Sequence, residues 1–538
     1  MYTLGLNAVF HDSSACLVKD GVVIDAVEEE RFTHIKHAKR PVPFSTWELP
    51  FHAIDFCLKK AGIALKDVDH FAYSFDPDLF KDEGPLTGLF LDAVRNAPRF
   101  LIDAVPHHLE LRWRGAKFPT PERWHFVEHH LTHAASAFHA SPHAEAAVMT
   151  IDGRGEDATT TFNFGHGNAL DRLAEVRMPH SLGLLYERVT EYLGFLHSSD
   201  EYKVMALASF GKPKFLKEFQ DIVQLGKNGQ YTIADLKLEE RFGPRRLRGG
   251  PMEARHYDLA HSLQVVLEDS VVELARWLEG ETGSKNLCLA GGVALNCVMN
   301  ARIRDRGPFK DIWVQPAAGD AGTALGAALW VDAKERRTDE RRYRMDHAYL
   351  GPSFEDAEIE KFLTWSRLTY RRLEHPAEDV AEILAQDKVI GWFQGPMEFG
   401  PRALGARSIL ASPIHAEMQS RLNEIKDRED FRPVAPMVLE EDAADWFVNA
   451  RVSPFMLFVF DVKPEKAALI PAVTHTDGTA RVQTVNRAAN PAVYDVMRAF
   501  KARTGVPVIV NTSFNTRGEP VVCTPRDAVE SFWTSPLD

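Results

Sequence analysis

The sequence has few cysteines, and they are not arranged in pairs. The 538-residue chain contains no CxxC motif, and its cysteines are odd in number and scattered: Cys16, Cys57, Cys288, Cys297 and Cys523. A zinc ribbon needs CxxC pairs, and a small secreted protein held by disulfides needs a denser, even set of cysteines. The sequence indicates neither kind of protein.

Long apolar stretches are also lacking. The N-terminal sequence MYTLGLNAVF has no basic segment followed by a long apolar core, so it does not match a secretory signal. No apolar run reaches the roughly 20 residues that are needed to cross a bilayer. We therefore expect a cytoplasmic protein with no membrane partner.

Positive charge is in deficit. The chain has 63 Lys and Arg against 76 Asp and Glu, which gives a net charge of -13 and a pI of about 5.9. Such a surface repels a phosphate backbone, so we expect no DNA or tRNA partner. A small anionic substrate would need a local cluster of cationic side chains.

The sequence does contain short apolar runs that predict strands. Tyr2–Val9 is one such run, and Cys16–Val18 with Val22–Glu28 predict a β-hairpin around the turn Lys19-Asp20-Gly21. Three later runs each lead into a loop of glycine and aspartate: Ala146–Ile151, Asn286–Ala290 and Ile312–Val314. No internal repeat stands out in the sequence.

Helical patterns lie between these runs, for example Leu259–Leu278. Alternation of strand, loop and helix is typical of an α/β architecture, with ligands at the carboxyl ends of the strands. The charged stretch KERRTDERRYR, residues 334–344, indicates a helix end or a linker, and Ser353 is expected to cap a helix at Phe354–Trp365. We expect two domains, 1–345 and 346–538.

A metal site is indicated by His129 and His133, which are four residues apart in an alanine-rich helical pattern. This spacing puts both imidazoles on one helix face, as chelation requires. About one such pair is expected by chance among 22 histidines, and the sequence has three. Only this pair is expected to lie in a helix, because His125 falls in the preceding strand pattern and His143 follows a proline. Asp152 and Asp320, at predicted strand ends, are candidates for the other ligands, and the set suits Fe(II), Zn or Mn.

Two loops carry further candidate residues. The turn His11–Ala15 offers free backbone N–H groups to a phosphate, although an ordinary Asp-Ser turn is the better interpretation of this motif taken alone. The loop Gly291-Gly292-Val293-Ala294-Leu295-Asn296 allows close approach of the backbone to a nucleotide, and a glycine pair alone is weak evidence for this.

In the second domain, cationic side chains lie among glycine, proline and apolar residues and not on a polar helix face. They are Arg402, Arg407, Lys426, Arg428 and Arg432. Converging guanidinium groups bind anions such as phosphates well, whereas solvated surface arginines are the alternative interpretation. A predicted strand, Val506–Val510, leads into Asn511-Thr512-Ser513-Phe514-Asn515, whose amides and hydroxyls suit phosphate or carbamate oxygens.

Several of these motifs occur in one order: EHHLTHAASAF, IDGRGE, EYKVMALASFG, AGGVALN, GDAGTALGAAL, GPMEFGPRALGARSI, KDREDFRPVAPMV and VNTSFNTRGEPVV. Together with the N-terminal LGLNAVFHDSSACLVKDGVVIDAVEEERFTHIKH, this set resembles the O-carbamoyltransferases of antibiotic and nodulation-factor biosynthesis over nearly the whole chain. One departure is that the chain ends at Asp538, soon after Phe532-Trp533, whereas members of the family often run further.

The resemblance implies an actin/hexokinase-like ATPase fold of the threonylcarbamoyl-adenosine-enzyme type, followed by a smaller α/β domain that forms carbamoyl-adenylate. It implies Fe(II) at His129, His133, Asp152 and Asp320, with ATP, carbamoyl phosphate and Mg²⁺ as further requirements. His11 and Lys36 fall at positions that the family uses around the adenylate and the acceptor. The implied ligands of carbamoyl phosphate and ATP in the second domain are Arg402, Arg407, Lys426, Arg432, Arg481 and Asn511.

The resulting hypothesis is transfer of a carbamoyl group to a hydroxyl of a small, glycosylated natural product. His11 is the candidate general base and Asp12 the alternative. The loop with Gly291, Gly292 and Asn296 is expected to contact the adenosine. The rival hypotheses are a threonylcarbamoyl-type or sugar-kinase-like enzyme, and a non-catalytic nucleotide sensor.

Overall fold

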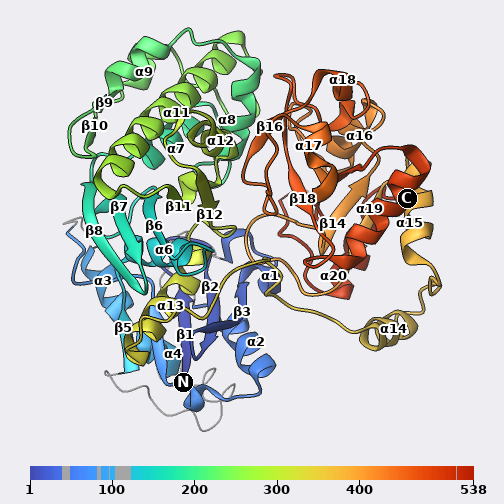
Figure 1. Ribbon diagram of the computed structural model, residues 1–538, viewed down its shortest axis with the longest axis horizontal. Helices are drawn as coiled ribbons and strands as arrows, with labels where there is room; N and C mark the ends of the chain where they lie inside the picture. The colour runs from blue at the N-terminus through green and yellow to red at the C-terminus, as the bar shows by residue number, and fades with distance from the viewer. Residues whose placement is uncertain (39–48, 82–86, 96, 103–122, 517) are drawn as a thin grey trace. The chain divides into compact units, whose positions relative to one another are not determined.

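The computed structural model describes residues 1–38, 49–81, 87–95, 97–102, 123–516 and 518–538 (Figure 1). The chain divides into two compact units, Met1–Met345 and Asp346–Asp538, called unit 1 and unit 2 below. Among the described residues, no helix is both long enough and apolar enough to span a membrane.

Unit 1 begins with a five-stranded sheet. Its order is β3-β2-β1-β4-β5, with strands β1 (Tyr2–Asn7), β2 (Ser14–Lys19), β3 (Val22–Glu28), β4 (His70–Tyr73) and β5 (Trp124–Phe126). The first three strands are antiparallel neighbours, and β4 and β5 run parallel to β1. The predicted hairpin is confirmed, and Asp20 (φ 50°) and Gly21 (φ 86°) supply the left-handed backbone of its turn.

A second sheet in unit 1 repeats this arrangement. Its order is β12-β11-β6-β7-β8, with strands β6 (Glu145–Ile151), β7 (Ala158–His166), β8 (Ala169–Arg177), β11 (Asn286–Ala290) and β12 (Asp311–Val314). Three antiparallel strands again come first, and two parallel strands again extend the sheet from the first of them. Unit 1 therefore has the duplicated sheet of the actin/hexokinase-like ATPase class, although the sequence shows no repeat.

Helices follow and connect these strands. The long predicted helix is confirmed as α11 (Ala254–Thr282), and it contacts α8 and α12. The other described helices of unit 1 are α1 (Glu30–Thr33), α2 (Phe51–Ala61), α3 (Thr87–Arg95), α4 (Ala97–Ile102), α6 (His129–Phe138), α7 (Leu182–Tyr192), α8 (Glu201–Leu207), α9 (Leu216–Ile222), α10 (Leu238–Phe242), α12 (Cys297–Arg306) and α13 (Ala321–Arg336). A small hairpin pairs β9 (Val223–Leu225) with β10 (Tyr231–Ile233).

Helix α13 packs closely against both the first sheet and α6 (Figure 1). A Cβ atom on Gly5 of β1 would lie 1.9 Å from the carbonyl oxygen of Ala324, and one on Gly326 would lie 1.8 Å from that of Thr132. Glycine is thus required at both contacts, because any side chain there would overlap the backbone of the neighbouring element. The close approach fixes the position of α6, which carries His129 and His133, relative to α13, which begins directly after Asp320.

We expect Gly326→Ala to lower the free energy of unfolding by about 2–3 kcal/mol, because the added methyl group must push α13 away from α6. Denaturant unfolding of the purified protein measures the change. Gly280→Ala in α11 is the matched control, because its Cβ would meet no atom within 4 Å and the change should be neutral or slightly stabilising. Equal stability of Gly326→Ala and the wild type would refute this close packing.

Unit 2 contains one five-stranded sheet and a smaller two-stranded one. The larger has the order β13-β14-β19-β15-β18, with strands β13 (Ile390–Phe393), β14 (Arg407–Ala411), β15 (Ala435–Leu439), β18 (Gln483–Val485) and β19 (Val508–Ser513). The smaller pairs β16 (Val459–Asp461) with β17 (Thr479–Arg481). The helices of unit 2 are α14 (Asp356–Trp365), α15 (Pro376–Ala385), α16 (Glu417–Ile425), α17 (Ala443–Trp446), α18 (Pro464–Ala467), α19 (Pro491–Thr504) and α20 (Pro525–Trp533).

Two local predictions in unit 2 are wrong. Ser353 does not cap the first helix, which begins at Asp356 after Glu355, because Glu355 and Glu358 form a reciprocal capping box. The strand predicted to end at Val510 continues to Ser513, because it lies inside the sheet and pairs with β14 up to Ser408. Asn511 is therefore a strand residue and does not belong to a loop.

Candidate metal centre and transfer site

The first residues of α6 carry the two predicted imidazole ligands. His129 and His133 are fully buried, and their Nε2 atoms are 3.1 Å apart. The helix begins at His129 because the Glu156 carboxylate accepts hydrogen bonds from the His129 N–H (3.0 and 3.1 Å), as an acid at a helix N-terminus does. The predicted helix and its i, i+4 pair are confirmed.

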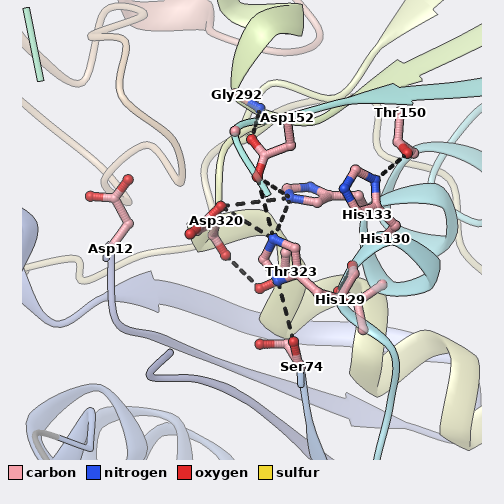
Figure 2. Close-up of polar contacts among 12 residues, drawn as sticks. Asp12, Ser74, His129, His130, His133, Thr150, Asp152, Gly292, Asp320 and Thr323 are labelled. Atoms are coloured by element: carbon pink, nitrogen blue, oxygen red, sulfur yellow. Dashed lines mark hydrogen bonds and ion pairs between the residues drawn. The ribbon is translucent and has the colours of Figure 1, made fainter. Parts of the chain in front are cut away.

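Asp152 and Asp320 meet this pair from two other segments. Asp152 follows β6, and Asp320 is the residue before α13. The Oδ1 atom of Asp320 lies 3.6 Å from the Nε2 atom of each histidine. The Oδ2 atom of Asp152 lies 3.5 Å from Nε2 of His129 and 3.9 Å from Nε2 of His133. One ligand atom from each of the four residues lies within 4.8 Å of all the others, and all four residues are buried (Figure 2). We call these residues the four-residue cluster.

Neighbouring backbone groups orient the cluster. His129 Nδ1 lies 3.3 Å from the carbonyl oxygen of Ser74, and a hydrogen bond there leaves the Nε2 lone pair facing the carboxylates (Figure 2). The backbone N–H of Gly292 donates to Asp152 Oδ1 at 2.7 Å, which leaves Oδ2 for the centre of the cluster. Contacts of this kind are typical of metal ligands, whose outer atoms are held by a second layer of hydrogen bonds.

Charge in the cluster favours a cation. Burial alone would lower the pKa of His129, because it disfavours the charged ring. The hydrogen bonds and negative charges of Asp152 and Asp320 have a larger, opposite effect and raise this pKa well above its ordinary value. Burial would likewise raise the pKa of Asp320, yet His11 and His129 hold that pKa far below its usual range. Two buried carboxylates thus need positive charge beside them, and the two-nitrogen, two-oxygen ligand set fits Fe(II), Zn or Mn.

Asp12 lies next to the four-residue cluster and binds two histidines. His11 Nδ1 and His37 Nδ1 donate to its two carboxylate oxygens at 2.9 and 2.7 Å. On the other side of the His11 ring, Nε2 is 4.0 Å from Oδ2 of Asp320. The loop is held by Asn7, whose Nδ2 donates to the carbonyl oxygens of His11 and Asp12. Burial lowers the affinity of the His11 ring for a proton, but Asp320 and Asp12 outweigh this and raise its pKa to about 10.

His37 extends this row, and the sequence interpretation missed it. Its Nε2 lies 3.1 Å from Ser199 Oγ, which also accepts a hydrogen bond from Lys36 Nζ at 3.1 Å. Lys36, a predicted site residue, is therefore connected to Asp12 by a chain of contacts through the Ser199 hydroxyl and the His37 ring. His37 follows Lys36 directly and has a left-handed backbone (φ 63°), and nothing in the sequence distinguished it from the other histidines.

The loop Gly291–Asn296 is held by local packing. Gly291 has φ 90°, and a Cβ there would lie 2.2 Å from the carbonyl oxygen of Ile151. Asn296 caps α12 by accepting from the Met299 N–H, and its amide also exchanges hydrogen bonds with Gln264. These contacts explain Gly291 and Asn296 without a ligand, so contact of the loop with adenosine stays a prediction.

Two predicted ligands in unit 2 are engaged in internal contacts. The Arg407 guanidinium is fully buried, donates to the carbonyl oxygens of Gln394, Gly395, Ala406 and Pro352, and lies 3.7 Å from the ring centroid of Phe393. Asn511 donates to Ala403 and Gln483 from within β19. Both side chains hold the sheet and the loop before β14 together, which we infer to be their main role.

We expect Arg407→Ala to lower the free energy of unfolding by about 3 kcal/mol or more, because it leaves a cavity and several buried carbonyl groups without donors. Denaturant unfolding followed by the intrinsic tryptophan fluorescence measures this. Arg371→Ala, at an exposed position of unit 2, is the control and should change the free energy by less than about 0.5 kcal/mol. A stable Arg407→Ala protein that only binds substrates less tightly would return this arginine to the list of direct ligands.

The other predicted cations of unit 2 lie around Lys426. Burial, then the charges of Arg428 and Arg432, lower the pKa of Lys426 well below its ordinary value. Its Nζ donates to the carbonyl oxygens of Ser513 (2.5 Å) and Asn515 (2.8 Å) and has no carboxylate within ion-pair distance in the described part of the chain. Arg432 is partly exposed and lies 3.6 Å from the Glu429 carboxylate. Arg402 and Arg481 are also partly buried in unit 2.

Comparisons with known proteins identify the family. The model "Carbamoyltransferase N-terminus" matches residues 2–84 and 111–329, and "Carbamoyltransferase C-terminus" matches residues 381–538. Nodulation protein NolNO of Sinorhizobium fredii is 42% identical over 99% of this chain and 78% of its own length. Nodulation protein NolO of Bradyrhizobium diazoefficiens is 43% identical over 77% of each chain.

A protein of Synechocystis, sll1178, is 42% identical over 100% of this chain and 95% of its own length. Among solved structures, T. kodakarensis HypF is similar with a TM-score of 0.34 and 15% identity, over 62% of this chain and 48% of that one. The fold assignment depends on the repeated sheet order and not on this weak likeness. The family models, which together span most of both units, and the nodulation relatives lead to one conclusion: the chain belongs to the carbamoyltransferase family.

Proposed function

We propose that this carbamoyltransferase uses ATP and carbamoyl phosphate to carbamoylate a hydroxyl group of a small molecule in the cytoplasm. The observation that carries the proposal is the four-residue cluster beside the His11–Asp12–His37 row. It combines ligands for a cation, which would hold and polarise an activated carbamoyl group, with groups able to take a proton from a hydroxyl. A second, separate cationic group in unit 2 suits the formation of that activated carbamoyl group.

The first half-reaction is assigned to unit 2. Hydrolysis of the phosphorus–oxygen bond of carbamoyl phosphate releases phosphate and leaves carbamate. A carbamate oxygen then attacks the α-phosphorus of ATP, pyrophosphate leaves, and carbamoyl-adenylate is formed. Both substrates are strongly anionic, so Arg428 and Arg432 would bind them and neutralise the charge that develops on pyrophosphate. Lys426, whose ammonium donates to Ser513 and Asn515, would hold this segment beside them. Arg402 and Arg481 are proposed as further contacts, and Mg²⁺ would accompany ATP.

The second half-reaction is assigned to unit 1. The acceptor oxygen forms a bond to the carbamoyl carbon, the bond from that carbon to the AMP oxygen breaks, and AMP leaves. His11 is the proposed acceptor of the hydroxyl proton and Asp12 the alternative, because both lie beside the four-residue cluster. Asp320 and Asp12 raise the pKa of His11, so the ring can take a proton only once a cation bound by Asp320 offsets that negative charge and leaves His11 neutral. A bound Fe(II), the ion that the family resemblance favours, would supply Lewis-acid polarisation at the carbamoyl group. Lys36 and the Gly291-Gly292 backbone are proposed to contact the adenylate.

The acceptor is proposed to be a sugar-bearing natural product, as the resemblance of the motifs to the O-carbamoyltransferases of antibiotic and nodulation-factor biosynthesis suggests. The test combines the full chain with ATP, carbamoyl phosphate and a set of hydroxylated acceptors, followed by mass spectrometry. We expect AMP, pyrophosphate and a product heavier by one carbamoyl group. A product heavier by one phosphate, with ADP, would instead indicate a sugar-kinase-like enzyme. Absence of any turnover with all acceptors would favour a nucleotide sensor.

A further inference from the structure

Unit 1 contains a second group of metal-ligand atoms outside the site described above. His70 of β4, His125 of β5 and Glu335 of α13 each place one ligand atom within 4.8 Å of the other two. His70 Nδ1 and His125 Nε2 are 3.0 Å apart. The two rings are half-buried, and Glu335 is exposed, so solvent reaches this group. We call it the β4–β5–α13 cluster.

The register of the first sheet places the two imidazoles together. β4 and β5 are parallel neighbours in which Ala72 lies opposite His125. Side chains alternate between the two faces of a strand, so His70 shares a face with Ala72, and therefore with His125. This is the face that α13 covers, because Ala72 packs in one apolar cluster with Ala327 and Val331.

The period of α13 brings the carboxylate to the same place. Ala327, Val331 and Glu335 follow each other at four-residue intervals, so they form one stripe along the helix. The first two pack against the sheet, and the third has a ligand atom within 4.8 Å of those of the two histidines. The apolar contact between α13 and the sheet therefore ends at three side chains that can bind a metal ion, His70, His125 and Glu335.

We propose that the β4–β5–α13 cluster is a second metal site, which binds a divalent transition-metal ion such as Zn²⁺ through His70, His125 and Glu335. Two imidazoles and one carboxylate are a ligand set that Zn²⁺ accepts, with water at the remaining position of a solvent-accessible site. Lys334, the nearby cation, has its ammonium 4.8 Å from the ring centroid of Trp330.

An ion at this position would join the segments that carry the four-residue cluster. His125 is four residues before His129 and lies in the strand that leads into α6. Glu335 is in the last turn of the helix that begins directly after Asp320. An ion at the second site therefore links segment 125–133, which contains His129 and His133, to segment 320–335, which begins with Asp320. Binding of the ion stabilises the arrangement of these two segments, which provide three residues of the four-residue cluster.

The test counts bound Zn²⁺ in the full chain after removal of all metal and equilibrium dialysis against micromolar Zn²⁺. The wild type is expected to bind two ions. His129→Ala combined with His133→Ala should bind one, held by the β4–β5–α13 cluster. Adding His125→Gln to that double variant should abolish Zn²⁺ binding. His125→Gln alone should bind one ion fewer than the wild type. It should also lose part of the rise in melting temperature that Zn²⁺ produces in the wild type.

Glu335→Gln provides a second variant at an exposed helix position, where loss of folding is not expected, and it should weaken binding at this site at least about ten-fold. His166→Gln is the control, because His166 also pairs with a carboxylate, Asp171, at an exposed place in unit 1 and should leave the count at two. A His125→Gln chain that binds as many Zn²⁺ ions as the wild type, or a Glu335→Gln chain that binds the ion of this cluster as tightly as the wild type, would overturn the proposal. A chain with both His129→Ala and His133→Ala that binds no Zn²⁺ would overturn it as well. Failure of the four-residue cluster to bind Zn²⁺ would not change the ion expected at the β4–β5–α13 cluster.

Discussion

His129→Ala is expected to abolish carbamoyl transfer while the exchange of pyrophosphate into ATP, in the presence of carbamoyl phosphate, continues at the wild-type rate. The substitution removes one of four buried ligand groups and leaves two carboxylates with less positive charge beside them. Changing a group that only supports a metal ligand already costs about 10–100-fold in metal affinity or activity, so loss of a ligand should cost at least about a hundred-fold. Metal content after dialysis should fall with the transfer rate.

The same substitution separates the two half-reactions because it lies in unit 1, whereas the proposed adenylate-forming groups lie in unit 2. His166→Gln serves as the control for histidine substitution in unit 1, and it should change neither rate. If His129→Ala protein freed of metal still formed carbamoylated product at the normal rate, the four-residue cluster would have no part in transfer. If pyrophosphate exchange fell equally, the assignment of adenylate formation to unit 2 alone would be wrong.

The meeting of the four cluster residues was predictable because each has a local signal. A helical pattern puts His129 and His133 on one face, and the carboxyl ends of strands in an α/β fold point to one edge, where Asp152 and Asp320 follow strands. His37 had no such signal, since its place beside Asp12 results from a left-handed turn and a contact across 25 positions of the chain. Long-range contacts of this kind depend on the packing of whole elements.

The sequence interpretation was least informative about buried polar side chains. Arg407 and Asn511 lie in sequences with the composition of an anion site, yet their donors bind carbonyl and amide oxygens of the same unit. Composition shows that a guanidinium is surrounded by small and apolar residues, but not whether the oxygens that it meets belong to the backbone or to a ligand. The repeat of the two sheets was hidden for a related reason: strand order and direction are repeated, while the side chains on the strands differ.

Arg432→Ala is expected to give the opposite pattern to His129→Ala. Three cations, Lys426, Arg428 and Arg432, lie close enough for the two arginines to lower the pKa of the lysine. The Glu429 carboxylate lies 3.6 Å from Arg432, and a bound phosphate would add negative charge beside all three side chains, so this group is suited to carbamoyl phosphate or the phosphates of ATP. Removing one positioned cation should reduce pyrophosphate exchange by about a hundred-fold. Overall product formation should fall by the same factor, because transfer then lacks its adenylate.

The control and a rescue decide whether Arg432 acts on substrate or on folding. Arg487→Ala removes another arginine of unit 2 that pairs with an acid, Asp495, at an exposed position, and it should leave exchange unchanged. Arg432→Lys should recover only part of the rate, because an ammonium group retains the charge but not the two-pronged geometry of a guanidinium. Arg432 is partly exposed, so the unfolding midpoint of Arg432→Ala should match that of the wild type. An unchanged exchange rate in this stable protein would show that the anion binds elsewhere, and the assignment of the cationic group around Lys426 would then have to be abandoned.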